Sequence, residues 1–163
     1  MKIIIVLDNI HTGGISKSLL NFLPHICKYG ECDLLLFRND NIDETLIPSN
    51  VNIIIGDDKL SILGMSQSEI KFKSKTLFLY RSLLVIIARI FGGHFSRRIL
   101  FRHINDIGEY DLAISYSQDV RWNSISTGCN QFVIEKTKAL YKAAFIHCDY
   151  EHFRGYDKRQ ILE

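Results

Sequence analysis

Two stretches far apart in the chain carry residues suited to binding and transfer chemistry. Near the amino terminus, Gly13 and Gly14 follow an apolar run and precede apolar residues at helical spacing. A helix that begins at such a turn presents unbonded backbone N–H groups and the positive end of its dipole, which together bind an anion such as a phosphate. Near the other end, His147 leaves a second apolar run, where its ring can donate a hydrogen bond to a phosphate or a sugar hydroxyl.

Both features also have a purely structural interpretation. The glycine pair can serve only to permit a tight turn, and His147 can be bonded to a backbone carbonyl. The turn lacks the spacing of a GxxxxGK[ST] loop and the third glycine of GxGxxG, and the next apolar run ends in Phe37-Arg38 without a ribose-binding acid. These departures disfavour dinucleotide binding.

A further polar group follows the apolar stretch at 111–115, and it consists of Tyr116, Ser117, Gln118, Asp119 and Trp122. Its aromatic and amide groups suit a sugar acceptor, although the same residues can form a loop with Asp119 as a helix N-cap. The cluster His147, Cys148, Asp149 and His152 matches no zinc spacing, and neighbouring strand residues point to opposite faces. We therefore predict no metal site.

The elements that must position these residues alternate strand and helix. Apolar β-branched runs and their flanking glycines predict strands at 2–7, 32–37, 51–55, 111–115 and 143–147. Helical spacing predicts helices at 14–29, 67–91, 94–107 and 120–128. This alternation predicts an α/β fold with a mainly parallel sheet and helices on both faces. Ligands of such sheets bind beyond the carboxyl ends of the strands, which here include 8–14, 115–119 and 147–149.

Composition limits the class of protein. A chain of 163 residues with 47% hydrophobic residues is long and apolar enough for one globular domain. Its four cysteines form no CxxC pair, as expected for free thiols in a reducing cytosol. No signal peptide is evident, and the longest apolar stretch, 77–91, is too short and too charged to span a bilayer. We therefore expect a cytoplasmic protein.

Positive charge is concentrated between residues 71 and 103, a stretch without Asp or Glu. Its basic residues are Lys71, Lys73, Lys75, Arg81, Arg89, Arg97, Arg98 and Arg102. Cations interleaved with many apolar side chains are typical of a helix that lies on an anionic membrane surface. They are equally typical of a helix that faces the core and has a basic solvent face. No nucleic-acid-binding module accompanies them, so we predict no nucleic-acid partner.

Three segments in this order resemble the amino-terminal half of a group 1 glycosyltransferase (family 4, GT-B fold). They are the apolar strand, Gly-Gly turn and Leu-Leu-Asn helix of 3–23, the YDLAISY of 110–116, and the KAAFIHCDY of 142–150. The second is similar to the family's YDVAIS strand, and the third to its K-x-x-x-WIH-x-D strand. One departure is Ser16, where many members carry glutamate.

The resemblance implies a Rossmann-like three-layer sandwich that forms half of a two-domain enzyme. In this family the active site lies between an amino-terminal acceptor domain and a carboxy-terminal domain that binds the nucleotide sugar and carries an E-x7-E motif. No such motif occurs in this chain. We therefore expect 1–161 to be the acceptor-side domain, 162–163 to be a possible tag remnant, and the donor-binding domain to be absent from this chain. The isolated chain is then expected to lack transferase activity.

The resemblance also assigns roles. It makes His147 the catalytic residue, in contact with the transferred sugar or its phosphate, and it brings Gly13 and Gly14 to the donor phosphate or the acceptor. We also expect Ser16, Tyr116 and Asp149 to bind substrate. The implied partners are a nucleotide-sugar donor, a glycan or lipid-linked acceptor and the chain's own carboxy-terminal domain. The implied reaction retains anomeric configuration, needs no cofactor, and takes place at the inner face of the plasma membrane in many relatives. The alternative is a stand-alone flavodoxin-like binding or regulatory module.

Overall fold

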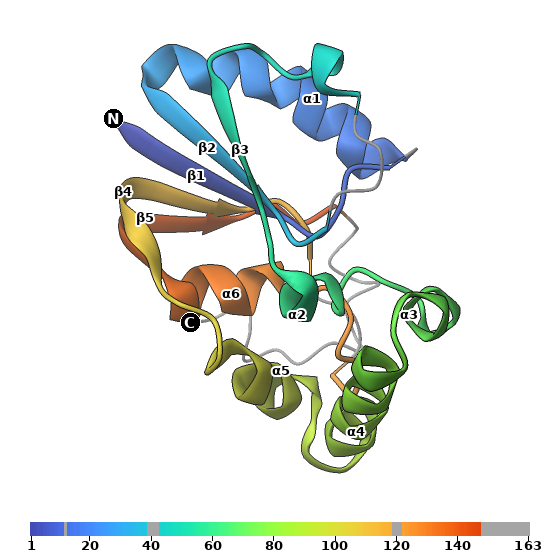
Figure 1. The fold of residues 1–163 in the computed structure, drawn as a ribbon. Coiled ribbons are helices and arrows are strands. Elements are labelled where there is room, and N and C mark those ends of the chain that lie inside the picture. Colours follow the sequence, from blue (N-terminus) through green and yellow to red (C-terminus); the bar gives the residue numbers. More distant parts are fainter. Residues whose placement is uncertain (12, 39–42, 119–121, 148–163) are drawn as a thin grey trace.

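Five parallel strands form a single sheet (Figure 1). The computed structural model describes residues 1–11, 13–38, 43–118 and 122–147. The strands are β1 (Lys2–Leu7), β2 (Glu31–Leu36), β3 (Val51–Ile55), β4 (Ile107–Ser115) and β5 (Thr137–Ala144). Their spatial order is β3-β2-β1-β4-β5, and every neighbouring pair is parallel. This order is that of a doubly wound Rossmann-like sheet, so the predicted α/β fold is confirmed.

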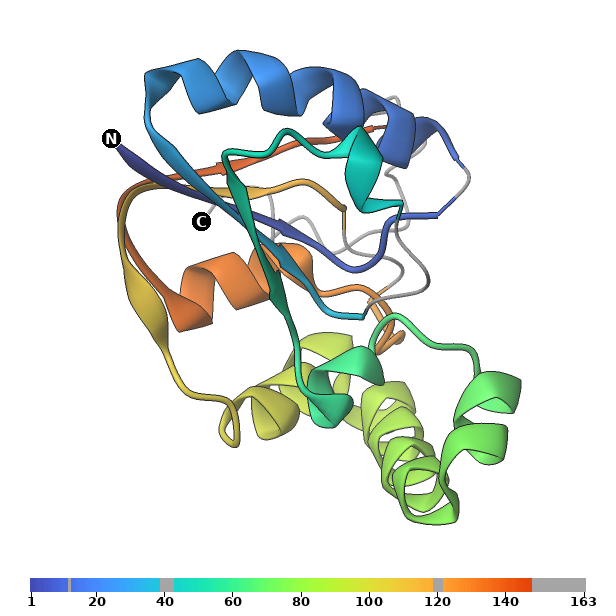
Figure 2. The same ribbon diagram turned by 45° about the horizontal axis from the view of Figure 1, so that its top comes forward.

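Helices cover both faces of the sheet and make a three-layer sandwich (Figures 1 and 2). One face is covered by α1 (Gly14–Ile26), which continues into a short 3-10 helix at Cys27–Tyr29. The helices on the other side are α2 (Asp58–Ser61), α3 (Gln67–Lys73), α4 (Lys75–Phe91), α5 (Gly93–Phe101) and α6 (Cys129–Lys136). A second 3-10 turn at Glu44–Leu46 precedes β3.

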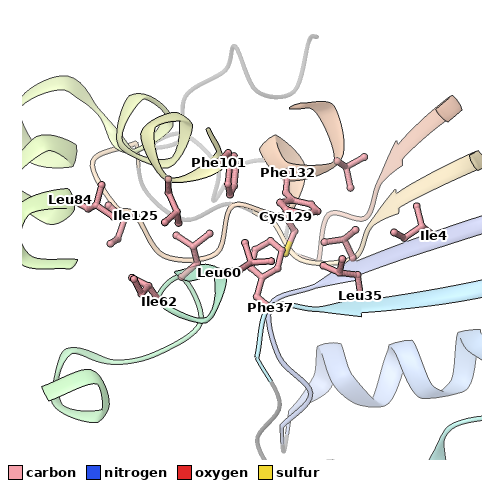
Figure 3. Close-up of a cluster of buried hydrophobic side chains, with 14 of the residues drawn as sticks. Ile4, Leu35, Phe37, Leu60, Ile62, Leu84, Phe101, Ile125, Cys129 and Phe132 are labelled. Carbon is pink, nitrogen blue, oxygen red and sulfur yellow. The ribbon is translucent and has the colours of Figure 1, made fainter. Parts of the chain in front are cut away.

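The central strand β1 supplies both layers of the core. Ile4 and Val6 pack among residues of α2 to α6, whereas Ile3 and Ile5 pack under α1. Successive strand residues point to opposite faces, and both faces here are covered, which explains the unbroken apolar run. Figure 3 shows the larger layer, where the ring of Phe132 meets those of Phe37 and Phe101 edge to face at 5.2 and 5.4 Å.

The predicted helical region at 67–91 is confirmed in its extent, but the chain breaks at Ser74 and divides it into α3 and α4. Ser74 is extended, with φ −161° and ψ 128°, and its Oγ accepts a hydrogen bond from the backbone N–H of Leu77. A serine that caps a new helix competes with continuation of the old one. The predicted helix at 94–107 is also shorter, since α5 ends at Phe101 and β4 begins at Ile107.

The predicted strand at 143–147 and helix at 120–128 are misplaced. The last strand is β5, which ends at Ala144, and the helix before it is α6. β5 pairs with β4 on one side and ends the sheet, and most of its residues are exposed. Because an exposed edge strand needs no continuous apolar run, the search for apolar runs found only the last two residues of β5 and extended the strand beyond its end.

The cysteines of the described residues form no disulfide with one another. Cys27, Cys32 and Cys129 are buried thiols, as the sequence predicts, and Cys148 lies outside the described residues. Burial, together with the neighbouring Cys27, raises the pKa of Cys32 to about 12. None of the helices described here is long and apolar enough to cross a membrane.

Candidate functional site

The strand order reverses between β1 and β4, which lie side by side at the centre of the sheet. The chain leaves β1 toward α1 on one face, and leaves β4 toward α6 on the other. The loops therefore diverge at the carboxyl ends of these two strands, and this divergence is where doubly wound sheets bind ligands. Gly13 and Gly14 follow β1, and His147 follows β5 beside β4, so the topology brings both predicted features to this edge.

The amino end of α1 is open. Gly13 occupies the N-cap position and has no side chain to accept a bond from the first helical N–H groups. Among the described residues, a Cβ added to Gly13 or Gly14 would meet nothing within 4 Å, and Gly13 has the extended φ of 176° that any residue adopts. The fold itself therefore does not require glycine at either position. Without side chains at these two positions, the first backbone N–H groups of α1 and the positive end of its dipole could interact with an anion.

Ser16 is buried and supports this turn from inside. It is 4% exposed, and its Oγ accepts a hydrogen bond of 3.1 Å from the backbone N–H of His11. Ser16 therefore fixes the segment that leads into α1. Almost none of that side chain reaches the surface, and its predicted role in substrate binding stays a prediction.

Tyr116 is likewise a positioning residue. It is 1% exposed, its hydroxyl lies 2.9 Å from Ser18 Oγ, and its ring packs on Phe22 and Phe145 with centroid distances of 5.7 and 4.5 Å. These contacts join α1 to the end of β4. The Tyr116 side chain is therefore enclosed on this face of the sheet, and its predicted role in substrate binding stays a prediction.

His147 is held at this edge by two hydrogen bonds. Its backbone N–H donates to Gln118 Oε1 at 3.0 Å, and its ring Nε2 lies 2.8 Å from the carbonyl oxygen of Tyr116. A carbonyl oxygen only accepts hydrogen bonds, so Nε2 carries the proton in this contact. In the neutral ring, Nδ1 is then the unprotonated nitrogen that can accept a hydrogen bond. Among the residues described, none forms a hydrogen bond with Nδ1. The half-buried ring thus has one anchored nitrogen and, as far as the described residues go, one nitrogen without a hydrogen bond.

The remaining predicted site residues have different fates. Asp149 and Asp119 lie outside the described residues. Gln118 is half-buried and is engaged with the backbone of His147. Sequence reasoning missed Ser18, which contacts Tyr116 across 98 positions of the chain, and no local pattern marks such a pair.

The end of β2 is occupied by an ion pair. Arg38 Nη1 donates to the carbonyl oxygen of Gly64 at 2.9 Å, and Nη2 lies 3.0 Å from Glu69 Oε1. The hydrogen bonds from Arg38 and Ser66 lower the pKa of Glu69 to about 2. This position, where a ribose-binding acid would stand in a dinucleotide site, is thus tied into the segment around α3.

The basic region divides into inner and outer cations. Arg81 and Arg97 are 7% and 2% exposed, so their predicted place on a membrane-facing surface is wrong. Arg97 donates to Gln131 Oε1 and to the carbonyl oxygen of Ser124 at 2.8 and 3.0 Å. The other cations of the region are exposed, and they are Lys71, Lys73, Lys75, Arg89, Arg98 and Arg102.

Comparisons with known proteins add no relative: no family, no curated protein and no solved structure matches this chain. Within the ranges that the structure describes, no three His, Cys, Asp or Glu side chains gather as metal ligands. The arrangement at the carboxyl edge can bind an anion at the start of α1 and can exchange a hydrogen bond through His147.

Proposed function

We propose that this chain forms the acceptor-side domain of a nucleotide-sugar-dependent glycosyltransferase that builds a polysaccharide, glycolipid or cell-envelope glycan. The observation that carries the proposal is the bare amino end of α1 at the reversal of strand order, beside a histidine with one anchored ring nitrogen. When a sugar leaves its nucleotide, negative charge develops on the departing phosphate. Backbone N–H groups and a helix dipole stabilise such charge in place.

His147 is the proposed catalytic residue. Because Nε2 is bound to the carbonyl of Tyr116, the ring presents Nδ1 to the transferred sugar or to its phosphate. A neutral ring accepts a hydrogen bond from a sugar hydroxyl through Nδ1, and a protonated ring donates one to a phosphate. The proposed reaction retains anomeric configuration and needs no metal, and both properties are those of the family that the sequence resembles.

The second wall of the site belongs to another domain in this proposal. Gly13, Gly14 and His147 line one edge of one sheet and supply no group that recognises a nucleotide base. The proposed donor-binding domain, in the same polypeptide or supplied separately, holds the nucleotide. The acceptor is a glycan or a lipid-linked sugar, and the proposed place of work is the cytoplasmic side of the plasma membrane.

The test measures sugar transfer from nucleotide sugars by the protein joined to its donor-binding domain. His147→Gln keeps a donor to the Tyr116 carbonyl but removes Nδ1, so we expect stable folding and a loss of kcat of about a hundredfold or more. Gly14→Asp places a negative charge at the anion site and should lower activity similarly. Gly14→Asn is the matched control, because its side chain has the size of aspartate without the negative charge, so the difference between the two variants reports the charge alone.

Two outcomes would contradict the proposal. One is full activity in His147→Gln or Gly14→Asp. The other is a protein that consumes no nucleotide sugar with any donor-binding domain encoded with it, yet binds a phosphate ligand at Gly14. That second result would favour the stand-alone binding or regulatory module.

A further inference from the structure

Helix α4 is apolar on two opposite faces. Its inner face contributes the buried Leu84 and Ala88 to the core. Its outer face carries a stripe of large side chains that are between 54% and 67% exposed, and these are Leu79, Leu83, Ile86 and Ile90. With 3.6 residues per turn, this spacing confines the four to an arc of about 60° and a length of about 17 Å. We call these four residues the outer stripe.

The surroundings of the outer stripe are positively charged. No Asp or Glu occurs from residue 70 to residue 105. Lys75 lies one turn before Leu79, and Arg89 lies three positions after Ile86, so both exposed cations border the stripe. Lys71 on the preceding helix is exposed as well. Arg81 and Arg97 are buried. The cations that a partner could contact beside the stripe are therefore the exposed ones, Lys71, Lys75 and Arg89.

We propose that the outer stripe of α4 docks on an anionic lipid bilayer surface. The four apolar side chains enter the boundary between headgroups and acyl chains, and Lys71, Lys75 and Arg89 meet the lipid phosphates. Figure 2 shows α4 at the periphery of the molecule, on the side away from α1. This inference names the surface for the membrane location given under the proposed function, on which it rests, and its test needs no sugar.

Charge decides between a bilayer and a second copy of the chain. Two copies joined through this stripe about a twofold axis would bring Lys75 and Arg89 of one copy close to the same cations of the other. Like charges at such a contact are unfavourable, whereas anionic headgroups neutralise them. The apolar stripe and its cationic border therefore fit an anionic lipid surface better than they fit the same surface of a second copy.

The first experiment measures flotation of the 163-residue chain with vesicles. One set is phosphatidylcholine with about one third phosphatidylglycerol, and the other is phosphatidylcholine alone. We expect binding to the anionic vesicles, loss of that binding at high salt, and much weaker binding to the neutral vesicles.

Matched variants test the stripe and its border separately. Leu83→Ser with Ile86→Ser should weaken binding at least about tenfold, while Leu140→Ser with Tyr141→Ser on β5, apolar residues that are even more exposed, should not. Lys75→Gln with Arg89→Gln should weaken binding roughly tenfold, whereas Lys28→Gln with Lys138→Gln should have little effect. Thermal unfolding checks that each variant is folded.

Three results would overturn the proposal: equal binding to neutral and anionic vesicles, unchanged binding of the Leu83/Ile86 variant, or no binding at all. Sedimentation velocity without lipid tests the alternative that a second copy of the chain docks on the outer stripe. A dimer that the Leu83/Ile86 variant dissociates would assign the stripe to a second copy and refute lipid docking. Because no sugar donor is present, failure here leaves the sugar-transfer proposal standing.

Discussion

Arg97 Nε donates a 2.8 Å hydrogen bond to Gln131 Oε1 in the interior between α5 and α6. Gln131 in turn donates to the carbonyl oxygen of His94 and to Glu135, so the buried guanidinium belongs to a connected network. We predict that Arg97→Met lowers the free energy of unfolding by about 3 kcal/mol, because it strands buried acceptors on Gln131 and Ser124. Urea denaturation measures this, and an unchanged midpoint would contradict it.

For Arg81, the other buried arginine, we predict that substitution does not lower the free energy of unfolding. It is also buried, but within the described ranges its Nε has no hydrogen-bond partner. Burial lowers the pKa of Arg81, and the charge of Glu69 only partly offsets this. We therefore expect Arg81→Met to leave the free energy of unfolding unchanged or to raise it by about 1 kcal/mol. A loss of comparable size to that of Arg97→Met, in the same urea experiment, would refute this.

The Glu69 carboxylate should contribute to stability only above acidic pH. Its pKa is lowered to about 2 by Arg38 and Ser66, so the folded state favours the charged form. Because the pKa is lower in the folded state, the carboxylate stabilises the folded state fully at pH values above the pKa of the unfolded chain, near 4.5. This contribution is lost as the pH falls from there to about 2. The carboxylate is partly exposed, so solvent screening makes the effect smaller than the shift alone implies.

The measurement compares the pH dependence of unfolding in wild type and Glu69→Gln. The variant should lose stability at neutral pH and should show a flatter dependence between about pH 4.5 and 2. Parallel curves for the two proteins across that window would contradict the prediction.

Two glycines should respond oppositely to the same substitution. A Cβ on Gly93 would lie 1.9 Å from the carbonyl oxygen of Ser124, whereas one on Gly14 would meet open space. Gly93 also donates its N–H to the carbonyl oxygen of Trp122 at 2.6 Å, so the junction cannot shift freely. We expect Gly93→Ala to destabilise by about 2 kcal/mol and Gly14→Ala to be neutral within about 0.5 kcal/mol. Thermal unfolding of both variants tests this.

The tautomer of His147 can be observed directly. The contact with the Tyr116 carbonyl requires the proton on Nε2. Nitrogen-15 NMR of the ring in the neutral state should therefore show a protonated Nε2 and an unprotonated Nδ1. A proton on Nδ1 would remove the acceptor on which the proposed role of His147 depends.

Parts of this fold follow from local sequence alone. The apolar run at 3–7 predicts a buried strand, and Gly13-Gly14 followed by helical spacing predicts where α1 begins. Both are decided by residues next to one another, through side-chain alternation, helix periodicity and turn conformation. The same local patterns, repeated along the chain, were sufficient for the α/β class and for placing 13–14 and 147 at one edge of the sheet.

Tertiary structure decided which of these residues face outward. Arg81 and Leu83 lie two positions apart on one helix, yet the arginine is buried and the leucine is exposed. Tyr116 follows a strand at the expected edge, but α1 and Phe145 enclose its ring. Helical spacing determines which residues share a face. Only contacts between segments distant in sequence determine whether that face meets the core or the surroundings, so burial could not be predicted from the pattern alone.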